Sequence, residues 1–123
     1  ETIEWTTWLS EVYSGRKYEA TIVGLAGKLD PYSILRRYTT DYRNNFFNFN
    51  NKEYDALIEG AKKATTDEEI VKNYKRAQEI LRDEQAAIYI MDPELITSMD
   101  KKISGFEYYP LPYINFAKMN IGE

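Results

Sequence analysis

Two amphipathic helices, predicted in succession between residues 51 and 81, constrain the fold of this chain more than any other feature. In both, apolar residues recur at the spacing that places them on one helix face. The first helix begins after a cap at Asn50 or Asn51, and a break at residues 65–67 ends it. Thr66 begins the second, longer helix, with Glu69 as its capping-box partner. The apolar faces consist of Tyr54, Leu57, Ile58 and Ala61 in the first helix and of Ile70, Tyr74, Ala77, Ile80 and Leu81 in the second.

A short helix with an aromatic face is predicted near the amino end. Its apolar positions follow helical spacing, and Gly15 is placed to end it. At this spacing the two tryptophans are expected in the core rather than stacked on a solute. The apolar positions are Trp5, Trp8, Leu9 and Val12.

Two further segments precede the pair of helices. One or two helical turns are expected at residues 32–38, because Pro31 is tolerated in a first turn. Residues 42–51 mix asparagine with aromatic residues and are interpreted as an ordered loop with aromatic anchors.

Short apolar runs predict strands, and their order among the helices predicts an α/β fold with helices packed on a mixed sheet. A loop at residues 27–31 follows the first run, and Asp92-Pro93 breaks the chain after the second. A parallel sheet needs more strands, buried on both faces, than this chain supplies, so part of the fold is expected to be missing. The predicted strands are 18–24, 86–91, 95–99 and 114–118.

The composition excludes several function classes. The chain has no His and no Cys, so it offers no zinc site of the usual ligands, no thiol nucleophile and no His-based triad. Sixteen Lys and Arg against twenty Asp and Glu leave a net charge of -4, which predicts no nucleic-acid partner. No apolar run approaches the ~20 residues that span a bilayer, and residues 1–4 lack signal-peptide features. A mature or excised segment is therefore expected.

An ordered series of motifs along the chain resembles the bacterial extracellular solute-binding protein family 5, which binds peptides, oligopeptides and nickel. The series runs from a D-P loop through an N-x-E-Y-D-x-L helix start to a Y-x-x-A-Q-x-I-L helix. The resemblance covers nearly the whole chain. Its motifs lie at residues 24–31, 45–58, 74–81, 88–90 and 103–106.

This resemblance implies a partial lobe of a type II periplasmic-binding-protein fold. Family members are several times longer and close two lobes over a solute, so residues 1–92 would end the second lobe and 93–123 would return toward the first. The implied function is extracytoplasmic, in the periplasm or as a cell-surface lipoprotein. There the protein would capture a peptide or similar small solute and deliver it to ABC permease subunits in the membrane. No enzyme activity and no cofactor are expected.

The resemblance also implies that Leu25, Ala26, Gly27 and Lys28 line the ligand cleft. Peptide binders of the family commonly carry Trp at the Leu25 position and Asp at the Lys28 position, and that Asp pairs with the ligand amino group. A lysine cannot make this pair because like charges repel. Either Lys28 faces away, or the ligand offers an anionic or neutral group, or the ligand is not an ordinary free-amine peptide.

Other candidate residues have competing interpretations. Asp30 is a candidate ligand acceptor, although Asp before Pro is more often a turn former. Asn44 and Asn45 are candidates for hydrogen bonds to a backbone-like ligand, with loop capping as the alternative. Asp30 and Asp41 are the best case for a carboxylate-dependent glycosidase, without support from their spacing. A ligand-sensing lobe of a regulator with the same fold is the other alternative function.

Overall fold

The computed structural model describes residues 2–110 and 113–122, and the chain divides into two compact units, Glu1–Ile88 and Tyr89–Glu123. The first unit is helical, and the second contains a short two-stranded sheet. This is a helix-rich α/β chain. None of the helices in the described part of the chain is long and apolar enough to cross a membrane.

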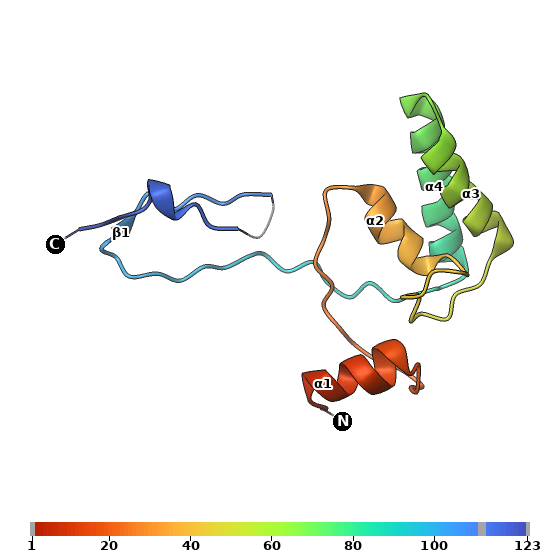
Figure 1. The fold of residues 1–123 in the computed structure, drawn as a ribbon, viewed down its shortest axis with the longest axis horizontal. Coiled ribbons are helices and arrows are strands. Elements are labelled where there is room, and N and C mark those ends of the chain that lie inside the picture. Colours follow the sequence, from red (N-terminus) through yellow and green to blue (C-terminus); the bar gives the residue numbers. More distant parts are fainter. Residues whose placement is uncertain (1, 111–112, 123) are drawn as a thin grey trace. The chain divides into compact units, whose positions relative to one another are not determined.

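The predicted pair of amphipathic helices is confirmed as α3, Lys52–Lys63, and α4, Asp67–Asp83, which pack side by side (Figure 1). Asn51 caps α3, since its side-chain oxygen accepts from the amide of Tyr54 at 2.8 Å. Thr66 caps α4 by accepting from the amide of Glu69 at 3.3 Å. Each cap satisfies an amide that would otherwise lack a partner in the helix.

Most residues of the predicted apolar faces belong to the first core cluster or pack against it; Ala61 is buried outside the cluster, and Ile70 is half-buried and not part of it. Buried side chains from both helices meet in this cluster, with Leu35 and Tyr38 added from the preceding segment. Tyr54 is fully buried, and its hydroxyl donates to the carbonyl of Leu35 at 2.6 Å. The helices contribute Tyr54, Ile58, Ala77, Ile80 and Leu81 to this cluster.

The predicted turns at residues 32–38 are also confirmed. They form α2, Pro31–Leu35, which continues as the 3₁₀ turn η2, Arg36–Tyr38. Pro31 occupies the first turn of α2. Its missing N–H costs nothing at this position, because the first amides of a helix have no partner within the helix. The bond from Tyr54 to Leu35 attaches α2 to the helix pair.

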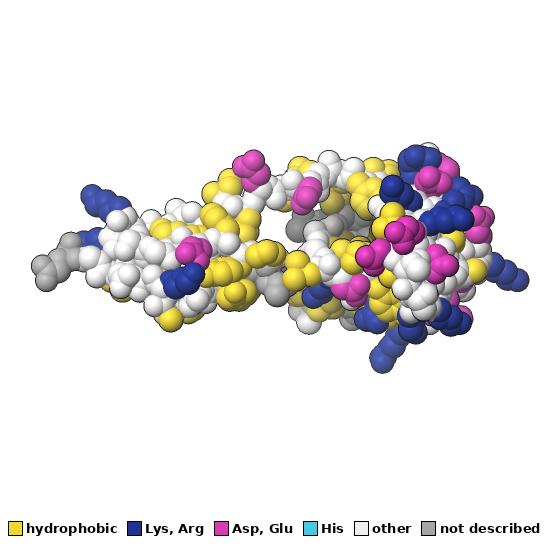
Figure 2. Space-filling model, turned by 90° about the horizontal axis from the view of Figure 1, so that it is seen from above, with side chains coloured by type: hydrophobic (Ala, Val, Ile, Leu, Met, Phe, Trp, Pro, Cys, Tyr) yellow, Lys and Arg dark blue, Asp and Glu magenta, His cyan; other side chains and the backbone are white. Residues whose placement is uncertain are grey.

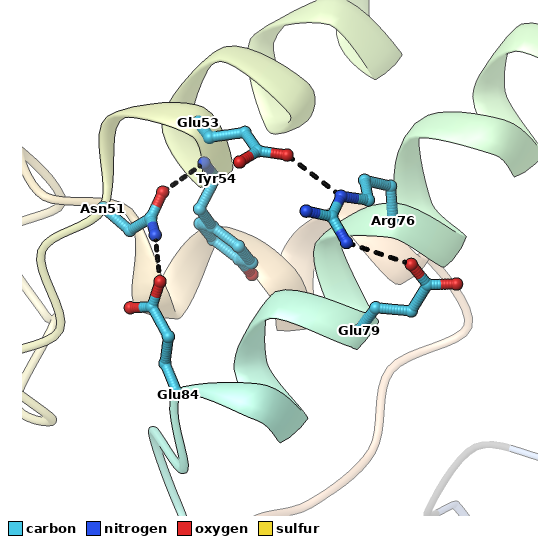
Figure 3. A network of polar contacts seen from close by, with 6 residues as sticks. All are labelled: Asn51, Glu53, Tyr54, Arg76, Glu79 and Glu84. Atoms are coloured by element: carbon cyan, nitrogen blue, oxygen red, sulfur yellow. Dashed lines mark hydrogen bonds and ion pairs between the residues drawn. The ribbon is translucent and has the colours of Figure 1, made fainter.

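Polar contacts on the surface link α3 to α4 (Figure 3). Arg76 bonds Glu53 of the facing helix at 2.9 Å and Glu79 one turn along its own helix at 3.2 Å. The amide of Asn51 donates to Glu84 just after α4. Solvent screens such exposed pairs, so the apolar interface dominates the stability of the helix pair. Figure 2 shows Lys and Arg interspersed with Asp and Glu over the end of the view where α3 and α4 lie.

The predicted amino-terminal helix is present, but most of it is wider than an α-helix. α1, Trp5–Thr7, leads into the π-helix η1, Trp8–Ser14. The amide of Gly15 reaches back to the carbonyl of Ser10 at 2.9 Å. A Cβ on Gly15 would lie 2.7 Å from the carbonyl oxygen of Glu11, so this close approach requires glycine.

The predicted aromatic loop joins this helix to the helix pair. Phe46 packs with Trp8 and Val12 in a second core cluster. Phe47 lies against both clusters, stacking on Tyr38 with ring centroids 4.2 Å apart. Trp8 is buried as predicted, whereas Trp5 stacks on it and is 59% exposed. The expectation that Trp5 lies in the core is therefore wrong.

The strands predicted at residues 18–24, 86–91 and 95–99 are wrong for this structure, in which these segments are irregular. Ile22, Ile88 and Ile96 are 83–86% exposed. A strand requires a neighbouring backbone with which to exchange hydrogen bonds. No described strand pairs with these segments, so these three side chains stay exposed, whereas Tyr18, Val23, Ala86 and Ala87 are half-buried against the core clusters.

The second unit holds the only sheet formed by the described residues. β1, Ile103–Ser104, pairs antiparallel with β2, Asn120–Ile121, with Ile103 opposite Ile121. The strand predicted at residues 114–118 is wrong, because the 3₁₀ turn η3, Phe116–Lys118, occupies most of it. Gly105 follows β1 with φ of 78°, where a Cβ would lie 2.0 Å from the carbonyl oxygen of Lys118.

The predicted packing of helices on a mixed sheet is thus not what the described residues form. The helices pack on one another, and the sheet has two strands of two residues each. A larger sheet does not form because, among the described residues, no backbone pairs with the apolar runs that were expected to be strands. The type II binding-protein fold and the division into lobes at residues 92 and 93 stay predictions.

Candidate functional site: an open loop before α2

The loop at residues 24–30, which contains most of the predicted site residues, is exposed along its length. Leu25 is 44% exposed and Leu29 67%. A Cβ placed on Gly24 or Gly27 would meet no heavy atom within 4 Å. Neither glycine has a positive φ, so the described part of the chain gives no conformational reason for glycine here. The loop is therefore open to close approach by another molecule.

The segments on either side of this loop are held to the first unit. On the amino side, the indole nitrogen of Trp8 donates to the hydroxyl of Thr21 at 2.9 Å. The hydroxyl of Tyr18 donates to the carbonyl of Phe46. On the other side, Asp30 begins α2. The open residues thus lie between two attached ends.

Asp30 uses both carboxylate oxygens to cap α2. One oxygen accepts from the amide of Tyr32 at 3.0 Å, and the other from the amide and hydroxyl of Ser33 at 3.1 and 2.8 Å. The Ser33 hydroxyl, the two amides and the charge of Arg36 lower the pKa of Asp30. The turn-forming interpretation of Asp30 is confirmed. A ligand-binding role for it stays a prediction.

Lys28 has a different environment. It is exposed, and among the described residues it has no ion pair or hydrogen bond. The loop residues Leu25, Ala26 and Gly27 precede it in the same irregular stretch. Lys28 therefore presents a positive charge that no described carboxylate neutralises by direct contact.

Asn45, the remaining predicted site residue, lies in the aromatic loop and is only 2% exposed. Its amide nitrogen donates to the carbonyls of Thr39 and Phe49 at 3.1 and 2.8 Å. Its side-chain oxygen is buried and has no hydrogen-bond partner among the described residues. These bonds fit the loop-capping interpretation. None of the hydrogen bonds that join described residues connects Asn45 to residues 24–30.

Arg36 is a cation near this loop that was not among the predicted site residues. Its guanidinium lies over the rings of Tyr32 and Tyr42, with its carbon 5.6 and 4.8 Å from the ring centroids. Its Nε is buried and has no acceptor among the described residues. Both rings favour the cation through their negative faces. The only signal in the sequence was the helical spacing between Tyr32 and Arg36.

Two surface recesses are lined by residues outside the loop at residues 24–30. One, of about 310 Å³, is lined by Tyr13, Ser14, Arg43 and Asn44. The other, of about 410 Å³, lies between α3 and α4. Among the lining residues, the sequence predicted only Asn44 as a ligand contact. The smaller recess was not predicted, because tertiary packing brings its two pairs of residues together from about thirty positions apart.

The described residues assemble no group of three or more Asp and Glu side chains that could hold a metal ion. Asp30 and Asp41 are the pair considered for a glycosidase. No hydrogen bond between described residues links the two side chains to each other or to a shared third residue. Asp30 instead makes the capping bonds described above.

The fold and the loop together define a helix-rich α/β chain with an open loop, whose Lys28 has no ion pair with any residue that the structure describes. No family model matches the chain. The chain is similar to Di/tripeptide-binding protein 1 of Pseudomonas aeruginosa (strain UCBPP-PA14), with 27% identity over 126 residues. The similarity covers 99% of this chain and 23% of that protein, so the chain spans about a quarter of its relative's length.

Proposed function

We propose that this chain is part of a solute-binding protein of family 5 that captures short peptides for an ABC importer. The observation that carries this proposal is the similarity to Di/tripeptide-binding protein 1, which runs through 99% of the chain. The ordered motifs at residues 24–31, 45–58, 74–81, 88–90 and 103–106 resemble the same family. Capture of this kind needs shape and hydrogen bonds but no reactive side chain, which suits a chain without His or Cys.

In this proposal the loop at residues 24–30 meets the ligand. Two observations support this position. The loop is open around Gly24 and Gly27, where backbone can approach a ligand without obstruction from a side chain. Its flanking segments are attached to the rest of the first unit through the Trp8–Thr21 bond on one side and through α2, which Tyr54 bonds at Leu35, on the other, so the open residues are held between two attached ends.

The proposal also accounts for the exposed apolar segments. Residues 18–24 and 86–99 would be covered by the remainder of a protein about four times as long, as the length of the relative suggests. Residues 1–92 would complete one lobe and 93–123 would return toward the other, with the solute between the lobes. The permease partner and the extracytoplasmic location follow from the same assignment.

Native mass spectrometry of the full-length protein, purified without denaturation from cells grown in peptide-rich medium, tests this function. We expect extra masses that fragment into short peptides. The same protein, unfolded and refolded to remove ligand, is the control and should lose those masses. A single non-peptide mass, or a protein that stays empty after incubation with peptide mixtures, would contradict the proposal.

A further inference from the structure

The charged groups of the open loop differ in what they can offer a ligand. Both carboxylate oxygens of Asp30 already accept hydrogen bonds from Tyr32 and Ser33. A ligand ammonium would have to share these oxygens with the capping amides. Lys28, two positions earlier, is exposed and makes no ion pair with a described residue. The charge that the loop has free to offer is therefore positive.

The surrounding sequence adds to this positive charge. Residues 16–43 contain six Lys and Arg against three Asp and Glu; Lys17 is paired with Glu11, just outside this range, at 2.8 Å, which leaves an excess of two positive charges in a chain whose net charge is -4. Arg36 is close enough to Asp30 to favour its ionised form, and its Nε lacks an acceptor among the described residues. A cationic ligand group at this loop would meet like charge, and an anionic group would meet opposite charge.

We propose that the loop receives a carboxylate of the ligand at Lys28, so that the preferred solutes are short peptides presenting an acidic group there rather than a free amino group. This inference rests on the proposed function. The carboxylate belongs either to an Asp or Glu side chain of the peptide or to its carboxy terminus. The ammonium of Lys28 would donate to it in a charge-assisted hydrogen bond.

Affinity measurements by calorimetry on the full-length protein test the inference with four tripeptide probes. Ala-Asp-Ala and Ala-Asn-Ala differ in a side-chain charge, and Ala-Ala-Ala with a free or an amidated carboxy terminus differs in the terminal charge. The variants are Lys28→Gln and, as a matched control, Lys75→Gln on the exposed surface of α4. Both lysines are exposed, so neither substitution removes buried packing.

We expect Lys28→Gln to weaken the binding of one charged probe about tenfold or more and to leave its uncharged counterpart unchanged, since a hydrogen bond to a charged group is of that size. Selective loss of Ala-Asp-Ala identifies a side-chain carboxylate. Selective loss of free Ala-Ala-Ala identifies the terminal carboxylate. Lys75→Gln should change neither.

Two results would overturn the inference, and they are distinguishable. If the tripeptides bind but Lys28→Gln weakens the two members of both pairs equally, or changes no affinity, the carboxylate assignment is wrong and the proposed function stands. If no tripeptide binds the full-length protein, the proposed function fails as well.

Discussion

At the residue scale, two charged side chains near the start of α2 differ in their contacts. The carboxylate of Asp30 caps the helix, whereas the ammonium of Lys28 makes no contact of its charge with a described residue. Asp30 and Lys28 lie two positions apart, and both were candidates for ligand contact. The structure gives Asp30 three hydrogen bonds at the start of α2 and gives Lys28 none among the described residues. The cap is a local feature that Asp before Pro already indicated. Whether Lys28 meets a ligand depends on a partner molecule.

Titration of Asp30 provides a test at this scale. Its ionised form is favoured in the folded chain, so its pKa should lie below the ordinary value of about 3.9. A lowered pKa contributes stability that is present above the unfolded pKa and is lost as pH falls through the folded pKa. We expect the amide resonances of Tyr32 and Ser33 to titrate below pH 3.9 in an NMR pH series.

The matched variant for this titration is Asp30→Asn. Asn also caps helices well but carries no charge, so the acid transition of these two amides should disappear. A transition at or above the ordinary Asp value in the unaltered chain would show that the capping bonds do not favour the carboxylate.

At the scale of elements, two core clusters meet at the aromatic loop. Phe46 belongs to the cluster with Trp8 and Val12, and Phe47 contacts both clusters. Asn45 holds this loop through bonds to Thr39 and Phe49. The π-helical turn of η1 and the helix pair are therefore attached to one another through a loop rather than by direct packing of their own buried residues.

Replacement of Phe46 by Ala should loosen the amino-terminal helix and spare the helix pair. The ring is 2% exposed, so its loss should cost about 3–5 kcal/mol in its own cluster. The chain has two tryptophans, Trp5 and Trp8, and both lie in the amino-terminal helix. Tryptophan emission should therefore shift to longer wavelength, while the far-ultraviolet circular dichroism of α3 and α4 is largely kept.

Phe106→Ala, in the second unit, is the control for this experiment, since Phe106 is a half-buried phenylalanine that contacts neither cluster. It should leave the tryptophan emission unchanged. A parallel loss of emission and helical signal in Phe46→Ala would mean that the two clusters unfold as one unit.

At the scale of the whole molecule, the chain combines a well-packed helical unit with apolar segments whose side chains are exposed. Ile88, Tyr89, Ile90 and Met91 are 63–86% exposed in succession. Exposed apolar segments of this length mark surfaces that pair with other protein surfaces or aggregate. Under the proposed function, they are strands whose partners belong to the rest of a longer protein.

Hydrogen exchange measured by mass spectrometry tests this explanation. In the isolated 123-residue chain, amides of α3 and α4 should be protected, and those at 18–24 and 90–99 should exchange fast, because none of them donates a hydrogen bond to a backbone carbonyl of a described residue. In the full-length protein, both segments should become protected. Fast exchange of both segments in the full-length protein would contradict their assignment as paired strands.

The sequence by itself determined the helices and their boundaries. The caps at Asn51 and Thr66 act within three residues, and the apolar periods of α3 and α4 repeat every turn, so both features are local. The open loop before α2 was equally visible, because Gly27, Asp30 and Pro31 disfavour regular structure on their own. Local propensity and period were sufficient for these elements.

Only the tertiary structure decided which apolar runs become strands, whether Asn45 is buried, and which charged side chains pair with one another. A run such as 18–24 is apolar and β-branched, yet it becomes a strand only where another backbone pairs with it. Asn45 is buried because Thr39 and Phe49 lie around it. Lys28 is free because no described carboxylate approaches it. The strands and the charges depend on groups elsewhere in the chain, and the bonds of Asn45 depend on how the loop around it folds, so residue type and period alone do not contain this information.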